Sequence, residues 1–225
     1  MLLSGGLDSA VLLVEEAARG EVQPVYVRGG LAWEGSERAA ISRFVEAAGL
    51  NGPARPLVEL TVEMTDVYPK SHWAIQGQPP GYHTPDEDVY LPGRNVILFG
   101  KAAVYCASAR IGRIVIGTLD HNPFPDATPA FRAAMQSALA LGLAHELTID
   151  APYARISKAS VIRRGIELGA PLALTLSCMR PVPAEGNIVH CGVCSKCRER
   201  HLAFAEARVG DPTVYADRRF MKSEA

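Results

Sequence analysis

The residues most suited to chemistry stand at the start of the chain. Met1–Leu3 is apolar, Ser4-Gly5-Gly6 is a turn, and Leu7-Asp8-Ser9 opens an apolar segment of helical character. The two glycines can adopt positive φ and leave their N–H groups unobstructed. The first N–H groups of a helix lack intrahelical partners, and the helix dipole adds partial positive charge there. This turn is therefore predicted to bind an anion, best of all a phosphate.

Asp8 needs its own explanation, because a carboxylate repels phosphate. It either caps the helix, which requires no ligand, or helps to hold Mg²⁺ between itself and the phosphates. The string Ser-Gly-Gly-x-Asp-Ser is more specific than two glycines. It resembles the PP-loop of the ATP pyrophosphatase superfamily, whose members cleave ATP to AMP and pyrophosphate. No Gly-Lys-Ser/Thr follows, so the turn is not a Walker A motif.

Four cysteines form the second strong signal. Cys178, Cys191, Cys194 and Cys197 are separated by 12, 2 and 2 residues. Four thiolates at such spacing can close a tetrahedral Zn²⁺ site, which would be structural because no coordination position stays open. An iron–sulfur cluster is the alternative, since four cysteines also serve that purpose. The fifth cysteine, Cys106, is expected in the core.

Two basic residues stand at predicted helix starts. Arg94 precedes a helix predicted over 96–111, and Asn95 is its expected cap. Arginine suits bidentate binding of phosphate or carboxylate, although a surface salt bridge is the simpler interpretation. Lys158 follows Ser157, a predicted N-cap, and lies in a first turn where the dipole favours acids. A nearby anion would explain that mismatch better than an exposed lysine does.

Alternating strands and helices must position these residues. The pattern predicts a doubly wound, mainly parallel α/β sheet. Strand ends then meet at a ligand crevice, so the loop 118–129, with Phe124 and Asp126, is expected beside the nucleotide. The predicted helices are 11–20, 36–49, 96–111, 131–143 and 159–168, and the predicted strands are 1–3, 22–27, 54–60, 114–117 and 146–150.

Composition limits the class of protein. The 225 residues suit an α/β nucleotide-binding domain over 1–175 followed by a zinc-binding segment and C-terminal helix over 176–225, with a frayed end. The segment 61–90 is rich in proline and glycine and predicts either a lid or partner contact, or a variable surface excursion. A net charge of −1 does not favour nucleic acid. No membrane helix or signal peptide is expected, and the clustered cysteines suggest a reducing, cytoplasmic compartment.

Several motifs together resemble the 7-cyano-7-deazaguanine synthase (ExsB/QueC-like) family. They are Ser4–Ser9, Leu91-Pro-Gly-Arg-Asn95, Ser157-Lys158 before a helix that ends Glu-Leu-Gly, Thr175-Leu-Ser-Cys178, and Cys-Gly-x-Cys-x-x-Cys at 191–197. The resemblance implies that 7-carboxy-7-deazaguanine attacks the α-phosphate of ATP to give an acyl-adenylate, that ammonia forms the amide, and that a second ATP yields the nitrile. It also implies a cytoplasmic homodimer.

Site roles follow from this resemblance. Asp8, Arg94 and Lys158 are the predicted catalytic residues, with Mg²⁺ at the phosphates and a structural Zn²⁺ at the four cysteines. Arg28, Phe124 and Asp126 are the predicted substrate-binding residues; stacking on Phe124 and base reading by Asp126 are hypotheses from side-chain chemistry. The predicted ATP-binding residues are Leu3, Ser4, Gly5, Gly6, Leu7, Asp8, Ser9, Gly93, Arg94, Asn95, Gly117 and Lys158.

Two segments differ from the family's usual pattern, namely Arg28-Gly29-Gly30 after Tyr26 and the loop after Gly117. A PP-loop enzyme that adenylates another carboxylate, amide or nucleobase is therefore a second interpretation. Its acceptor would be a small molecule, a tRNA or a protein, with Arg198, Arg200, Arg208, Arg218 and Arg219 available near the zinc site. A solvated basic face is the simpler reading of those arginines. A zinc-stapled module that only senses ATP is the third interpretation.

Overall fold

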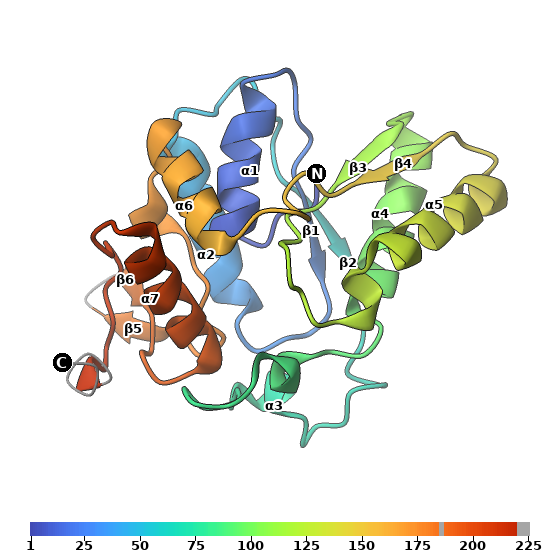
Figure 1. The fold of residues 1–225 in the computed structure, drawn as a ribbon. Helices are drawn as coiled ribbons and strands as arrows, with labels where there is room; N and C mark the ends of the chain where they lie inside the picture. The colour runs from blue at the N-terminus through green and yellow to red at the C-terminus, as the bar shows by residue number, and fades with distance from the viewer. Residues whose placement is uncertain (185–186, 220–225) are drawn as a thin grey trace.

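Parallel strands form the centre of the fold. The computed structural model describes residues 1–184 and 187–219, and Figure 1 shows helices on both sides of the strands. Strand β1 (Val25–Arg28) pairs in parallel with β2 (Val58–Thr61), with Val25 opposite Val58. Strand β3 (Arg113–Val115) pairs in parallel with β4 (Thr148–Asp150).

The N-terminal residues join the two pairs of strands. Leu2 forms a parallel bridge with Val25, and its N–H donates to the carbonyl of Val115 at 2.9 Å. The strand order is therefore β2, β1, residues 1–3, β3, β4. In this doubly wound order the direction of winding reverses between residues 1–3 and β3, where ligands of such sheets bind. The predicted α/β class and its parallel strands are confirmed.

Alternate side chains of these strands enter two cores. Leu2 and Val27 pack with α4 (Arg94–Ala109) and α5 (Pro129–Leu143), whereas Leu3 and Tyr26 pack with α1 (Leu7–Ala17) and α2 (Glu34–Ala47). Neighbouring strand residues point to opposite faces, so an unbroken apolar run serves both layers.

The observed helices begin earlier than predicted. Helices α1, α2, α4 and α5 start at Leu7, Glu34, Arg94 and Pro129. An apolar pattern marks the buried face of a helix and not its first turn, which explains the difference. The prediction that Asn95 caps α4 is wrong, because the N-cap is Gly93 and Asn95 is already helical. Ser157 does cap α6 (Lys158–Glu167), accepting a hydrogen bond from Ser160 N–H.

The strands are shorter than predicted. Over the predicted strand 22–27, Pro24 has no N–H to donate, and regular pairing begins at Val25. Val22 makes only a separate parallel bridge to Ala54. The predicted strand 54–60 is likewise regular only from Val58.

The segment 61–90 is ordered. It contains a short helix, α3 (Trp73–Gln76), and a 3₁₀ turn over Asp86–Val89. Trp73 stacks on Trp33 with ring centroids 5.8 Å apart, so the segment packs onto the start of α2. Figure 1 shows α3 below the strand ends, close to the C-terminal segment that carries the four cysteines.

The C-terminal part forms a small cluster around its four cysteines and also joins the main core. A hairpin of β5 (Val182–Ala184) and β6 (Asn187–Val189) precedes α7 (Ser195–Ala207). Ala203 and Phe204 of α7 pack into the cluster that also contains α1 and α6. The end of the tail predicted to fray, residues 220–225, lies outside the described residues.

No helix within residues 1–184 and 187–219 combines the length and the apolar character needed to cross a bilayer.

Candidate functional site

The glycine turn is held by its own hydroxyl groups. Gly5 has φ +75°, and a Cβ there would lie 3.0 Å from Ile41 Cγ1. Ser4 Oγ lies 3.2 Å from Ser9 Oγ and accepts the Gly6 N–H at 3.3 Å. The N-cap residue of α1 is Gly6, so no side chain caps the start of this helix. The first-turn N–H groups of α1 are therefore left to bind an anion.

Gly117 approaches this turn from β3. A Cβ on Gly117 would lie 3.2 Å from Ser9 N and 3.3 Å from Asp8 C. A side chain there would push the strand end away from the start of α1. The structure thus places Gly117 beside the glycine turn, at the edge of the sheet where the strand order reverses.

Asp8 and Lys158 meet although 150 positions separate them. Lys158 Nζ lies 3.1 Å from Asp8 Oδ2 and also pairs with Glu199. Burial lowers the pKa of Lys158, but Asp8 and Glu199 outweigh it and hold the pKa above its ordinary value. Burial raises the pKa of Asp8, while Lys158 acts in the opposite direction. The lysine in the first turn of α6 thus has anionic partners.

Asp8 keeps one oxygen free for a ligand. Oδ1 of Asp8 is buried and has no hydrogen-bond partner among the described residues. A buried carboxylate oxygen without a partner is costly, and a cation would compensate it. A carboxylate beside a phosphate site is a usual way to hold Mg²⁺, so the residues present fit that ion.

Glu199 and Lys196 belong to the same ion-pair chain, and sequence reasoning missed both. Lys196 Nζ lies 2.5 Å from Glu199 Oε2 on α7. Burial raises the pKa of Glu199, but Lys158 and Lys196 together hold it well below its ordinary value. Charged residues three apart on a helix are common, so the sequence offered only a weak signal.

Arg94 lies on the other side of the strand ends. It lines a narrow cavity of ≈ 20 Å³ together with Arg28 at the end of β1. Arg28 is 46% exposed in its side chain and lies 3.9 Å from Glu34. Arg28 and Arg94 thus line the same cavity, whereas Asp8 and Lys158 meet at the start of α1, beside the glycine turn. The residues that line this cavity are Val27, Arg28, Gly29, Leu31, Met64, Tyr68, Arg94, Ile97 and Leu98.

Phe124 and Asp126 lie beside the start of α4. Phe124 stacks on Tyr90 with ring centroids 5.2 Å apart. Asp126 is buried, and its Oδ2 accepts the backbone N–H of Asn95 at 2.9 Å. Asp126 thus provides the helix cap that was expected from Asn95. Its role in reading a base stays a prediction.

Tyr26 and Glu37 lie between the two regions. Tyr26 donates to Glu37 at 2.5 Å, and both side chains are buried. Burial raises the pKa of Glu37 to about 7, with Arg94 and the Tyr26 hydrogen bond acting to lower it. The Glu37 carbonyl also lies 3.1 Å from where a Gly5 Cβ would be. This pair therefore connects α2 both to the glycine turn and to the charge of Arg94.

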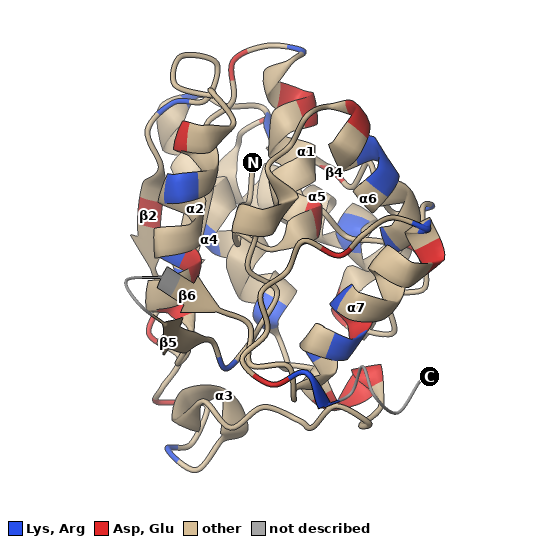
Figure 2. Ribbon diagram, turned by 90° about the vertical axis from the view of Figure 1, so that its left-hand side faces the viewer, with Lys and Arg blue, Asp and Glu red and all other residues tan. Residues whose placement is uncertain are grey.

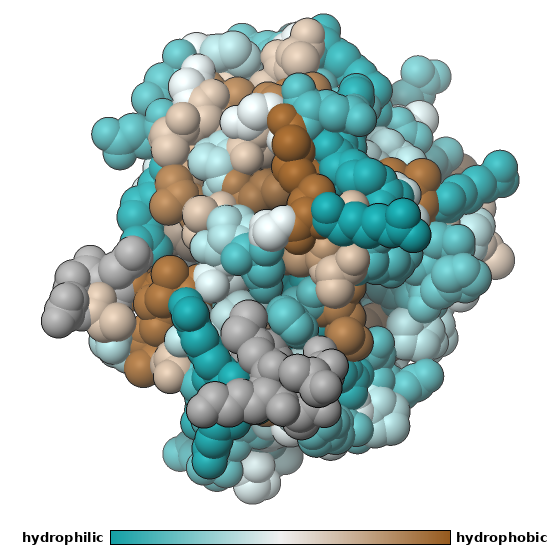
Figure 3. All heavy atoms as spheres, turned by 60° about the vertical axis from the view of Figure 1, so that its left-hand side comes forward, coloured by the Kyte–Doolittle hydropathy of each residue, from teal (hydrophilic) through white to brown (hydrophobic). Residues whose placement is uncertain are grey.

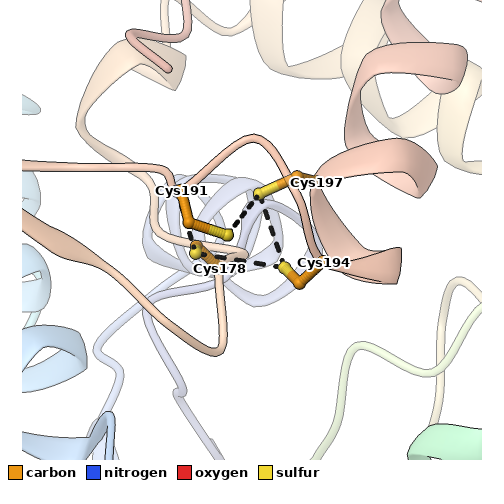
Figure 4. A group of neighbouring side chains, drawn as sticks. All are labelled: Cys178, Cys191, Cys194 and Cys197. Carbon is orange, nitrogen blue, oxygen red and sulfur yellow. Dashed lines mark hydrogen bonds between the residues drawn. The ribbon is translucent and has the colours of Figure 1, made fainter. Parts of the chain in front are cut away.

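The four cysteines converge as predicted. Their Sγ atoms all lie within 4.8 Å of one another, and all four residues are buried (Figure 4). Cys178 and Cys194 are 4.0 Å apart, Cys191 and Cys197 3.8 Å, and Cys194 and Cys197 3.5 Å. A tetrahedron with Zn–S bonds of about 2.3 Å needs sulfurs about 3.8 Å apart. The donor set therefore fits one tetrahedral metal ion.

The surroundings of the cysteines also suit bound thiolates. Backbone N–H groups of Arg180 and Cys191 donate to Cys178 Sγ, each at 3.3 Å. Gly192 has φ +80°, and a Cβ there would lie 1.9 Å from the Asp217 carbonyl oxygen, so glycine is required. His190 is not part of the cluster; its Nε2 accepts the Ser177 N–H at 3.1 Å.

The cysteine segment is fastened to the glycine turn. Leu176 N–H donates to the Gly5 carbonyl at 2.8 Å. Arg200 is fully buried and donates to Thr175 Oγ1 at 2.8 Å and to Thr213 Oγ1 at 2.6 Å. A metal that fixes this segment would therefore also fix Glu199 next to Lys158.

Two of the arginines expected to form a basic face near the four cysteines, Arg198 and Arg200, are engaged inside the fold. Arg200 is buried, and Arg198 donates to the carbonyls of Tyr82 and Thr84 at 2.8 and 2.7 Å, inside the segment 61–90. Figure 2 shows acidic and basic residues interspersed along α6 and α7, and Figure 3 shows hydrophobic patches between hydrophilic side chains on this side. These arginines therefore hold the fold together more than they form a polyanion-binding surface.

Comparison with known proteins supplies the family. The model of the queuosine biosynthesis protein QueC matches residues 1–208. A 7-cyano-7-deazaguanine synthase of Anaeromyxobacter dehalogenans is 34% identical over 226 residues, covering 96% of this chain and 94% of the relative. Another of that name from Methanopyrus kandleri is 34% identical over 229 residues, covering 96% and 98%. A third from Rhodopirellula baltica is 33% identical over 235 residues, covering 95% and 90%.

Proposed function

Since this chain belongs to the QueC family of queuosine biosynthesis proteins, we propose that it is an ATP-dependent, AMP-forming carbon–nitrogen ligase. It converts 7-carboxy-7-deazaguanine and ammonia to 7-cyano-7-deazaguanine. The observation that carries this proposal is the Asp8–Lys158 pair at the uncapped start of α1, beside the glycine turn. That arrangement suits a polyphosphate whose α-phosphorus is attacked.

The reaction needs two activations of one carbon. The substrate carboxylate attacks the α-phosphorus of ATP, the bond to pyrophosphate breaks, and an acyl-adenylate forms. Ammonia then displaces AMP and gives the amide. The amide oxygen attacks a second ATP in the same way, and loss of AMP and protons leaves the nitrile. Each activation bonds a substrate oxygen, a poor leaving group by itself, to AMP, with which it then departs. The protein must therefore mainly neutralise phosphate charge.

The region around the glycine turn, with Asp8 and Lys158, is called the phosphate side, and it supplies that neutralisation. First-turn N–H groups of α1, the hydroxyls of Ser4 and Ser9, and the ammonium of Lys158 would hold the pyrophosphate portion. Asp8 Oδ1 is the protein oxygen that would bind Mg²⁺, which supplies further charge neutralisation at the phosphates. Asp8 Oδ2 meanwhile orients Lys158 at 3.1 Å.

The cavity side would receive the deazaguanine. Arg94 or Arg28 can pair with its carboxylate, while Phe124 and Asp126 offer a stacking surface and an acceptor for its base edge. A cavity of ≈ 20 Å³ holds a water molecule or two but not a fused ring. Because Met64 and Tyr68 line it, the segment 61–90 must shift when substrate enters. This requirement supports the predicted lid over the alternative of a variable excursion.

Zinc is the proposed metal of the four cysteines. Sulfur separations of 3.5–4.0 Å suit a single ion. An iron–sulfur cluster places several iron atoms between its thiolates and needs them farther apart. With four protein ligands the ion would be structural and would stabilise the segment 176–225 against the nucleotide-binding part.

Compartment and assembly are part of the same proposal. None of the five cysteines, all of which lie in the described residues, forms a disulfide, which agrees with a reducing cytoplasm. A homodimer is proposed as well, and the exposed apolar side chains on α4 and α5, Val104 (52% exposed) and Leu141 (82% exposed), are candidates for its interface. Sedimentation equilibrium would show a mass of one chain if this part is wrong.

One assay tests the proposed activity. The protein is incubated with ATP, Mg²⁺, ammonium and 7-carboxy-7-deazaguanine, and AMP and the nitrile are followed by mass spectrometry. The proposal predicts both products, with none in the absence of the carboxylate. AMP without nitrile would support adenylation of another acceptor, and no AMP with any acceptor would support a module that only binds ATP.

A further inference from the structure

Three helix starts meet at one group of charges. Asp8 lies in the first turn of α1, Lys158 is the first residue of α6, and Lys196 is the second residue of α7. Glu199 connects the two lysines, because its Oε1 pairs with Lys158 and its Oε2 with Lys196. The chain of charges therefore runs from the glycine turn to the first turn of α7, which lies next to Cys194 and contains Cys197.

Two lysines at helix starts are an electrostatic mismatch. The N-terminus of a helix carries partial positive charge and favours anions, so a first-turn lysine is disfavoured there. Here α6 and α7 each carry one, and the start of α1 adds a third positive end. Two carboxylates, Asp8 and Glu199, balance the two ammonium groups. A polyphosphate beside them would be attracted by the lysines and repelled by the carboxylates.

Lys196 can reach such a ligand. Its side chain is 26% exposed, compared with 15% for Lys158. It also lies close to the glycine turn, because Glu199 contacts both lysines and Lys158 contacts Asp8 at 3.1 Å. Within residues 1–184 and 187–219, Glu199 is the one ion-pair partner of Lys196, so exchanging that partner for a phosphate leaves Lys196 paired.

We propose that Lys196, in the first turn of α7, is a second phosphate-binding lysine, and that Glu199 is a positioning residue that holds Lys158 and Lys196 until a polyphosphate replaces it. This inference rests on the proposed function, because ATP supplies the polyphosphate. Metal binding and nucleotide binding are then linked, since Cys194 and Cys197 fix the turn that carries Lys196. Glu199 competes with the phosphates, and its removal strengthens their binding.

The test measures binding of Mg²⁺–pyrophosphate to the full-length, metal-loaded protein by titration calorimetry. Lys196→Gln is expected to weaken binding about tenfold, the loss of one charge-assisted hydrogen bond. Lys196→Arg retains the charge and stays within about threefold of wild type. Lys101→Gln removes a lysine in the middle of α4, outside this group of charges, and is the matched control without effect. Metal content is measured for each variant, and Lys196→Met replaces Lys196→Gln if the latter loses metal.

Glu199→Gln gives the sharper readout. It is expected to tighten pyrophosphate binding severalfold, because one repelling charge is gone; a residue of purely structural value would weaken binding when replaced. In the Glu199→Gln background, Lys196→Gln should again weaken binding about tenfold. If that second step has no effect, Lys196 only neutralises Glu199 and the inference is overturned.

The inference and the proposed function fail in different ways. Wild-type protein that binds neither ATP nor pyrophosphate would overturn both. Wild-type protein that binds pyrophosphate while metal-loaded Lys196→Gln binds it equally well would overturn the role of Lys196 alone.

Discussion

The phosphate side and the cavity side of the strand ends are built in different ways. Asp8, Lys158 and Glu199 come from distant parts of the chain and are paired and largely buried. Arg28 and Arg94 line a narrow cavity next to the segment 61–90, and Arg28 is 46% exposed. Under the proposed function, the phosphate side is preorganised for charge, whereas the cavity side would have to move to admit a fused ring. This contrast suggests that the chemistry is fixed by the fold and that acceptor choice depends on a movable segment.

Removing the metal should affect the phosphate side most. Cys194→Ser is expected to abolish stoichiometric metal binding and to lower the free energy of unfolding by more than about 4 kcal/mol, since the binding energy of structural zinc is also folding energy. Affinity for pyrophosphate should fall more than affinity for 7-carboxy-7-deazaguanine. Atomic absorption, urea unfolding and calorimetry measure these changes.

The fifth cysteine provides the control. Cys106 is a buried core residue of α4 and lies outside the cysteine cluster. Cys106→Ser should keep one metal ion per chain and lose only the stability expected of a polar atom in an apolar site. Equal loss of binding for both ligands in Cys194→Ser would contradict the link between the metal and the phosphate side.

Lys158→Gln should nearly eliminate activation. Removing a charge aimed at the phosphates typically costs about 10²–10³ in kcat, or about 3–4 kcal/mol. Steady-state kinetics with ATP and ammonium would show the loss in kcat, with substrate affinity near that of wild type. Arg94→Gln is the matched change on the cavity side and should act mainly on KM for the carboxylate. If both variants change the same parameter, the two sides do not have separate roles.

Glu37 lies between the phosphate side and the cavity side, and its ionisation makes the stability of the fold depend on pH. Its ordinary pKa is 4.5 and burial raises the pKa to about 7 in the fold. Between these values the native state binds more protons than the unfolded state, so stability falls as pH rises. The contribution is present in full below pH 4.5 and is lost as pH rises through about 7, a change of about 3 kcal/mol at most.

Glu37→Gln tests that pH dependence. The variant cannot ionise, so its stability relative to wild type should increase from pH 5 to pH 8. Urea unfolding of both metal-loaded proteins at each pH gives the difference, in which the contribution of the metal cancels. A difference that does not change with pH would mean that Glu37 ionises as easily in the fold as in the unfolded chain.

Asp126→Asn should have the smallest effect and isolates base recognition. Asparagine keeps an oxygen that can accept the Asn95 N–H, so the start of α4 stays capped. If Asp126 reads the base edge, affinity for the carboxylate should fall about tenfold, or about 1.4 kcal/mol, in calorimetry. Unchanged affinity with unchanged stability would limit Asp126 to its cap.

The sequence predicted features that depend on local geometry. Gly5 needs positive φ, and the cysteine spacing allows one tetrahedron, so the glycine turn and the metal site could both be located. The α/β alternation likewise predicted the layers and the parallel strands. The site roles of residues other than the four cysteines, and the division at residue 175, stay predictions.

Tertiary partners could not be predicted in the same way. Glu199 and Lys196 look like an ordinary helix ion pair until α6 brings Lys158 beside them. From the sequence, Arg200 is expected to be a surface charge. In the structure it is fully buried and donates to the hydroxyls of Thr175 and Thr213. Asn95 looks like a cap, but a distant carboxylate, Asp126, takes that role. Each case depends on contact with a residue from another part of the chain, and the sequence alone does not show which residues come into contact.

Isotope transfer tests the central claim most directly. The substrate is prepared with ¹⁸O in both carboxylate oxygens and is turned over with ATP and ammonium. If the carboxylate and then the amide attack α-phosphorus, one labelled oxygen leaves with each AMP, and the nitrile retains none. Mass spectrometry should therefore find singly labelled AMP and unlabelled pyrophosphate. Unlabelled AMP, or label in pyrophosphate, would contradict activation at the glycine turn by adenylation.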